Sequence, residues 1–173
     1  MKHILLFFLS FLTISCTSQG QTESFDFDAA ETASFKIINT KTGKSIRIGS
    51  TKEEIISAFG TPDSSGTYVD ERDDLTYTKM KYNGIEFILY ENKEIHFIIN
   101  NGNYALKYKE AVIKINSDLK NLKPIFPSSF KKLKERGVLL VWLKFKGTIV
   151  DENIAFWYDS QGRISRIICG GYD

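Results

Sequence analysis

The stretch IRIGSTKEEIISAFGTP, residues 46–62, is the strongest indication of how the chain is organised, because its plan returns at residues 113–129 as IKINSDLKNLKPIFPSS. At a constant offset the two stretches share four identical pairs: Ile46/Ile113, Ile48/Ile115, Ser50/Ser117 and Phe59/Phe126. Similarity at a fixed spacing is the signature of a structural unit used more than once. The sequence therefore predicts one unit that occurs twice.

The first copy contains the signals of a short helix over residues 52–59. Ser50 and Thr51 each offer a helix N-cap, and Glu53 and Glu54 follow three residues after them, which is the pattern of a capping box at a helix start. Gly60 can end the helix in a left-handed conformation. Since a two-turn helix is not stable alone, we expect it to pack on a sheet. In the second copy, Pro124 predicts a shorter and less regular helix.

Strand-like runs follow each of these helices. They are rich in β-branched, aromatic and other apolar residues and are separated by turn signals such as Asn83-Gly84, which is the pattern of strands joined by tight turns. The runs cover residues 75–82, 85–90 and 94–99 in the first copy, and 138–145, 153–158 and 163–169 in the second. We therefore expect an α+β fold in which two tandem repeats, residues 35–102 and 103–173, pack short helices on an antiparallel β-sheet.

The N-terminus has the pattern of a secretory signal peptide. A positive charge precedes an apolar run over residues 4–14, which is too short to span a bilayer as a mature helix. The end of this run at Cys16 resembles the lipobox of bacterial lipoproteins, in which the cysteine becomes the lipidated first residue. That resemblance implies a signal peptide of residues 1–15 and a membrane anchor on Cys16. Residues 16–34, which lack an apolar period, are expected to form a flexible, lipidated tether.

Two alternatives to lipidation stay open for Cys16: ordinary cleavage of the signal peptide, and a disulfide with Cys169. We expect Cys169 to be a buried apolar residue of a C-terminal strand. If Cys16 is lipidated, Thr17 stands where an aspartate retains lipoproteins at the inner membrane of enteric bacteria. The resemblance therefore favours the outer membrane, on the side that faces the periplasm.

The composition argues against several classes of function. A net charge of +2 is too small to indicate a nucleic-acid partner. Removal of the signal peptide leaves His96 as the one histidine, so no Cys/His cluster indicates a metal. No glycine loop for a phosphate precedes a helix. We therefore expect no cofactor, no metal and no enzymatic activity, with an undetected hydrolase that uses His96 as its base as an open alternative.

One face of the predicted sheet has the composition of a binding surface. Alternation places Tyr77, Lys79 and Lys81 on one face of their strand, and Trp142 and Lys144 on the matching face in the second copy. Tyrosine and tryptophan contribute contact area at little cost in side-chain entropy, so an open face of this kind is typical of a protein-binding surface. The alternative is that these side chains merely shield the sheet.

Two charged clusters are expected to be solvated surface. Residues 63–74 are expected to form a polar loop, and its acidic side chains lack the spacing of a calcium loop: Asp70, Glu71, Asp73 and Asp74. A further helix is expected over residues 128–135, with a basic, solvent-exposed face formed by Lys131, Lys132, Lys134 and Arg136. Contact with anionic lipid headgroups is the alternative for the basic face.

The capped helix, the Gly-x-Pro after it and the aromatic strands resemble two related groups of proteins. These are the small outer-membrane assembly lipoproteins of the SmpA/OmlA type and the β-lactamase inhibitor protein family, which has two tandem copies. The resemblance covers roughly residues 35–170 and implies binding of an envelope protein. We expect an exported lipoprotein that acts as a non-enzymatic protein-binding module, with a role in outer-membrane assembly or maintenance. The alternative is an inhibitor of a periplasmic or extracellular enzyme, or a scavenger of a small ligand.

Overall fold

The computed structural model describes residues 27–71 and 74–170, which form twelve strands, two α-helices and two 3-10 turns. The helices and turns are α1 (Lys52–Phe59), α2 (Pro127–Arg136), η1 (Thr32–Ser34) and η2 (Leu119–Leu122). The strands are β1 (Ala29–Glu31), β2 (Phe35–Asn39), β3 (Ser45–Arg47), β4 (Ser64–Val69), β5 (Thr76–Tyr82), β6 (Ile85–Tyr90), β7 (Lys93–Ile99), β8 (Tyr104–Tyr108), β9 (Ala111–Lys114), β10 (Leu139–Phe145), β11 (Thr148–Tyr158) and β12 (Ile164–Cys169).

The strands form two sheets, each of which takes strands from both halves of the chain. The larger sheet has eight strands in the order β1-β10-β11-β12-β7-β6-β5-β4, and the smaller has four in the order β3-β2-β8-β9. In the larger sheet β1 runs parallel to β10, and every other pair is antiparallel. The two halves meet at the pair β7–β12, where Ile98 lies opposite Ile168.

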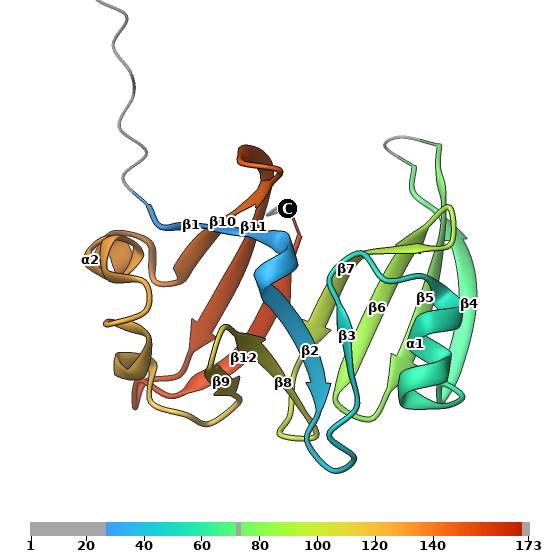
Figure 1. Cartoon of the computed structure of the whole chain (residues 1–173), viewed down its shortest axis with the longest axis horizontal. Helices are drawn as coiled ribbons and strands as arrows, with labels where there is room; N and C mark the ends of the chain where they lie inside the picture. The colour runs from blue at the N-terminus through green and yellow to red at the C-terminus, as the bar shows by residue number, and fades with distance from the viewer. Residues whose placement is uncertain (1–26, 72–73, 171–173) are drawn as a thin grey trace, which may run out of the picture.

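The core lies between the two sheets. Both α-helices and the smaller sheet lie on the same side of the larger sheet (Figure 1). We call this side of the larger sheet its inner face and the opposite side its outer face. Fully buried side chains from the larger sheet, the smaller sheet, α1 and the turn before α2 meet here, among them Met80, Phe87, Phe97, Val141, Phe156, Phe35, Ile37, Leu106, Ile55 and Phe126.

The expected α+β fold of two tandem repeats is wrong. The protein is predominantly β, and the layer that faces the larger sheet is mainly a second sheet rather than a row of helices. The segment after Ser117 forms the four-residue turn η2 and no α-helix. Local patterning missed β8 and β9 because these strands are short. It missed β4 because all six residues of this strand are exposed and their polarity resembles that of a loop.

Part of the predicted tether is ordered. β1 pairs with β10 over three residues, and Ala30 is buried there. Asp28 donates its backbone N–H to Ser129 Oγ at 3.0 Å and accepts from the Ser129 N–H at 2.8 Å. Hydrogen bonds of this kind leave no apolar period, which is why the sequence did not reveal them. The predicted signal peptide, Cys16 and the rest of the tether lie outside the described residues.

Several local predictions are confirmed. α1 has the expected bounds, and of the two capping pairs that the sequence offers the structure forms the one between Thr51 and Glu54. α2 exceeds its predicted range by one residue at each end. The strands expected after each helix are present, with ends that differ by one residue at most, except that β11 begins at Thr148, five residues before its predicted start. Cys169 is buried, as expected for an apolar role.

Candidate functional site

The predicted binding residues of the first half lie together on the outer face. Met80 and Tyr82 are buried on the inner face of β5, so Tyr77, Lys79 and Lys81 project from the opposite side. The described helices and the smaller sheet lie on the inner side of the larger sheet (Figure 1). Tyr77 and Lys79 are half-buried and Lys81 is exposed. The three side chains are therefore presented by a regular strand rather than by a loop.

The predicted residues of the second half lie at the other end of the same face. Trp142 and Lys144 are half-buried on β10, and β11, β12, β7 and β6 separate β10 from β5. Five strand spacings correspond to about 24 Å. At this end a small apolar cluster already occupies the outer face, with Leu140 buried and Phe27 packed against it. The structure therefore brings Tyr77, Lys79 and Lys81 together but places Trp142 and Lys144 apart from them.

Three tyrosines form a row across the outer face. Tyr68 on β4 lies opposite Tyr77 on β5, and Tyr77 lies opposite Tyr90 on β6. The ring centroids are 5.6 Å apart in the first pair and 5.7 Å apart in the second. Sequence reasoning missed Tyr68 because residues 63–74 resemble a loop. The signal that could have found it is the run Thr67-Tyr68-Val69, which is rich in residues that favour strands.

Two lysines beside this row share one carboxylate. Lys79 Nζ lies 2.9 Å from Glu86 Oε1, and Lys81 Nζ lies 3.4 Å from Glu86 Oε2. Lys79 Nζ also lies 5.5 Å from the centre of the Tyr68 ring. With two cations and one anion, this part of the surface keeps an excess of positive charge. A shallow hollow of about 390 Å³ adjoins it, lined by Ser64, Ser65, Gly66, Thr67, Tyr68, Lys79 and Lys81.

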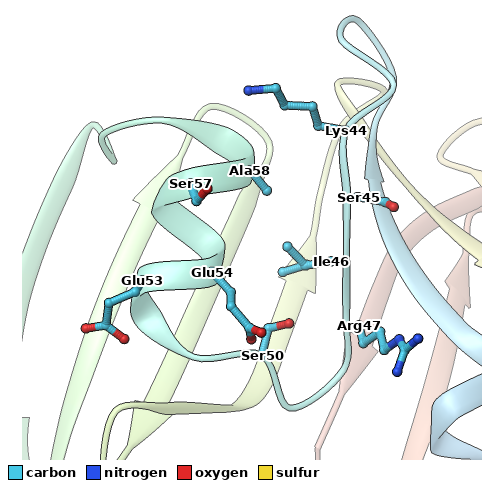
Figure 2. Close-up of a pocket in the computed structure, with 9 residues that line it drawn as sticks. All are labelled: Lys44, Ser45, Ile46, Arg47, Ser50, Glu53, Glu54, Ser57 and Ala58. Carbon is cyan, nitrogen blue, oxygen red and sulfur yellow. The ribbon is translucent and has the colours of Figure 1, made fainter.

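A second depression lies between β3 and α1 (Figure 2). It has a volume of about 720 Å³. Ile46 and Ala58 point toward one another across it, whereas the Ser45 and Arg47 side chains point to the far side of β3. Its acidic side chains already have partners, because Glu54 belongs to the capping box.

Glu53, the other acidic side chain of the depression between β3 and α1, is also hydrogen-bonded within the protein. Glu53 accepts two hydrogen bonds from Asn92 Nδ2, at 2.8 and 3.0 Å, and this contact lowers the pKa of Glu53. Carboxylates that are already bonded within the protein are poorly suited to bind a ligand. The depression between β3 and α1 therefore has no acidic group free to bind a ligand, and the tyrosine row is the better candidate for a binding site.

A buried carboxyl lies under the loop that enters α1. Glu94 is 2% exposed, and its Oε2 accepts a hydrogen bond from the Gly49 N–H at 2.6 Å. Burial raises the pKa of Glu94 to about 7, the bond from Gly49 acts in the opposite direction, and the charge of Glu152 raises the pKa further. Burial likewise raises the pKa of the Cys169 thiol, which favours the unreactive protonated form.

His96, the base considered for a hydrolase, lies on the outer face. It pairs with Ile88, and a Cβ on Gly170 would approach His96 Cδ2 to 2.7 Å, so the ring packs closely on the backbone there. Cys169 pairs with Phe97, which is buried on the inner face. The imidazole and the thiol therefore lie on opposite faces of the sheet.

The described members of the two charged clusters are exposed or half-buried: Glu71, Asp74 and Lys131 are exposed, and Asp70 and Lys132 are half-buried. Asp70 and Asp74 flank a turn in which the Asp74 N–H donates to the Asp70 carbonyl at 3.0 Å. Among the residues that the structure describes, no three His, Cys, Asp or Glu side chains are grouped so as to hold a metal ion. The prediction for Asp73, and the side chains of Lys134 and Arg136, lie outside the description. Within residues 27–71 and 74–170, no helix is both long and apolar enough to cross a bilayer.

Comparisons with known proteins add little to this picture. No family model matches the chain, and no curated protein matches it. One solved structure with some similarity is an extracellular protein containing an SCP domain from Bacillus anthracis str. Ames, which is 12% identical with a TM-score of 0.38. The match covers 72% of this chain and 44% of that chain. A likeness this slight carries no argument, and the resemblance to the small envelope lipoproteins stays a prediction.

Proposed function

We propose that the protein is an exported lipoprotein that acts as a non-enzymatic protein-binding module at the cell envelope. Its partner is another envelope protein, and its role lies in assembly or maintenance of the outer membrane. The observation that supports binding is the row Tyr68, Tyr77 and Tyr90 beside Lys79 and Lys81 on an uncovered sheet face.

The chemistry of this row suits a protein partner. Tyrosines supply large apolar rings with a polar end, and they lose little side-chain entropy on binding. The neighbouring strands hold the rings at fixed spacing, so the surface is already arranged before a partner arrives. The half-buried Lys79 and the exposed Lys81 beside the row favour encounter with a partner of negative potential.

Affinity capture from the native envelope tests the proposal. The full chain should retain one envelope protein at a constant ratio, and Tyr77→Ala should reduce this by about tenfold, the usual effect of removing an aromatic anchor. Val112→Ala is the matched control, because Val112 is 49% exposed on the smaller sheet, away from the row. Equal capture by wild type and Tyr77→Ala would refute a role for the row.

The anchor is tested separately. Cys16→Ser should leave the chain unacylated, so that the mass of its N-terminal peptide lacks the acyl groups and the protein no longer sediments with membranes. Capture that survives this change indicates the alternative function, inhibition of an envelope or extracellular enzyme, for which the lipid supplies only location.

A further inference from the structure

β4 is a six-residue strand whose outer edge pairs with no other strand of the described residues. It ends the eight-stranded sheet, and all six of its residues are exposed. Its pairing with β5 runs without a register shift from Ser64 to Val69, whereas the strand at the other edge, β1, has three residues. Natural edge strands are usually protected from pairing by charges, prolines or bulges. The sequence of β4, SSGTYV, contains no proline and no charged residue.

Alternation along β4 identifies the backbone groups that point outward. The Asp70 N–H donates to the Leu75 carbonyl at 3.0 Å, so this pair is hydrogen-bonded. Bonded and non-bonded pairs alternate in an antiparallel ladder, and Gly66 and Tyr68 therefore bond to β5. The N–H and C=O groups of the intervening residues face away from the sheet: Ser65, Thr67 and Val69.

The hollow on the outer face lies beside this edge. Gly66 has no side chain, and nothing approaches within 4 Å of the place where its Cβ would be. A residue that paired with Gly66 from an added strand would project its side chain into the hollow. Lys79 and Lys81 line this hollow and share Glu86 as their carboxylate, so an acidic side chain would complement the remaining charge.

We propose that β4 binds an extended segment of the partner protein as a ninth strand, with an acidic side chain of that segment opposite Gly66, between Tyr68 and Lys81. The mode is strand addition, in which backbone hydrogen bonds supply affinity and side-chain contacts supply specificity. The proposal rests on the proposed function, since it names how and what the same surface binds.

A second copy of this chain is a poorer occupant of the edge. In an antiparallel pair of two copies, the start of one β4 meets the end of the other. Asp63 precedes the strand, and Asp70 and Glu71 follow it. Like charges would therefore face each other at both ends of the pair, which is destabilising.

Hydrogen exchange with a defined probe tests the proposal on the full chain in detergent. The probes are two blocked, extended heptapeptides of alternating threonine and valine, one with a central glutamate and one with a central lysine. At a concentration that leaves a tenth of the sites empty, the glutamate peptide should slow exchange at the outward amides about tenfold. These amides belong to Ser65, Thr67 and Val69, while those of Gly66 and Tyr68 serve as internal references.

Two variants make the result specific. Thr67→Pro removes the central outward N–H without removing a bond to β5, and should abolish binding, whereas Thr67→Val keeps that N–H and is the matched control. The glutamate peptide should bind about fivefold more tightly than the lysine peptide, and Lys81→Glu should reverse this order. The reversal gives an answer even if Thr67→Pro folds poorly.

The outcomes separate this proposal from the proposed function. Unchanged exchange at the three amides with both peptides overturns strand addition, and equal binding of the two peptides overturns the acidic partner. If these three amides already exchange more slowly than exposed amides before peptide is added, and the protein sediments as a dimer, the occupant of the edge is a second copy of the chain and the proposal of an acidic partner segment is overturned. If Tyr77→Ala abolishes envelope capture while β4 ignores the peptides, strand addition fails and the protein-binding function stands. If the peptides bind but capture is unaffected by Tyr77→Ala, strand addition stands and the tyrosine row has no role in capture.

Discussion

The N-termini of the two α-helices differ in where the acceptor for their first N–H groups comes from. The first N–H groups of any helix lack partners within it. In α1 the partner comes from the adjacent residue, because Thr51 Oγ1 accepts from the Glu54 N–H and Glu54 Oε2 accepts from the Thr51 N–H. In α2 it comes from the other end of the chain, because Asp28 accepts from the Ser129 N–H. A cap within the segment is visible in the sequence, and a distant one is not.

A proline explains why the two copies of the cap motif lead to different structures. Asp118 accepts from the Lys120 N–H at 2.8 Å, as a helix cap does. The turn η2 that follows ends before Pro124, which has no N–H to continue the ladder. The helix of the second half starts instead at Pro127, where the missing N–H costs nothing.

The largest expected effect concerns the buried carboxyl beneath the entry of α1. Because burial raises the pKa of Glu94 in the folded protein to about 7, from 4.5 when unfolded, the folded state binds the proton more tightly. Its contribution to the free energy of unfolding is full below pH 4.5 and is lost as pH rises to about 7, a fall of about 3 kcal/mol. Denaturant unfolding of Glu94→Gln should lack this fall, whereas Glu91→Gln, at an exposed turn, should keep it. If the free energy of unfolding depends on pH in the same way for wild type and Glu94→Gln, burial does not raise the pKa of Glu94 as argued.

The ends of the two helices should differ in their tolerance of a side chain. Gly60 after α1 has φ 85° and ψ −169°, a region essentially restricted to glycine, whereas Gly137 after α2 has φ 68° and ψ 9°. We expect Gly60→Ala to cost about 2–3 kcal/mol and Gly137→Ala about 1 kcal/mol. Asparagine should be accepted at Gly137 and rejected at Gly60. Equal losses of thermal stability at both positions would show that the two ends are equivalent.

Removal of the Asp28 side chain, the distant cap of α2, should lower the free energy of unfolding by less than Gly60→Ala does. Asp28→Ala leaves the Ser129 N–H without its acceptor and should lower the free energy of unfolding by about 1.5 kcal/mol. Asp28→Asn keeps an acceptor oxygen and should recover most of this loss. Urea unfolding of both variants measures the difference. An unchanged midpoint for Asp28→Ala would mean that the bond from Asp28 to the Ser129 N–H does not stabilise α2.

The adjacent cap should show the smallest effect. Thr51→Ala should cost about 1 kcal/mol, and Thr51→Ser should be close to wild type because serine caps equally well. The same urea series provides the measurement. If Thr51→Ala costs more than Asp28→Ala, the order of the two caps proposed here is wrong.

These contrasts explain what the sequence could and could not predict. The bounds of α1 and of most strands of the larger sheet followed from signals within a few residues, such as Thr51, Glu54 and Gly60. Alternation predicted that Tyr77, Lys79 and Lys81 share one face of their strand, and the burial of Met80 and Tyr82 on the opposite face of β5 agrees with this. Strand order depends on contacts between distant segments, so the sequence could not show that β5 and β10 lie in opposite halves of the sheet. That is why Tyr77 and Trp142 were predicted together and lie apart.

The reciprocal bonds between Asp28 and Ser129 also fix where the chain leaves the folded body. They hold the first strand at one margin of the larger sheet, and β4 forms the opposite margin (Figure 1). Seven strand spacings correspond to about 34 Å. With the anchor on Cys16 that we propose, tension on the N-terminal segment would act first on β1 and β10, at the edge of the sheet opposite β4.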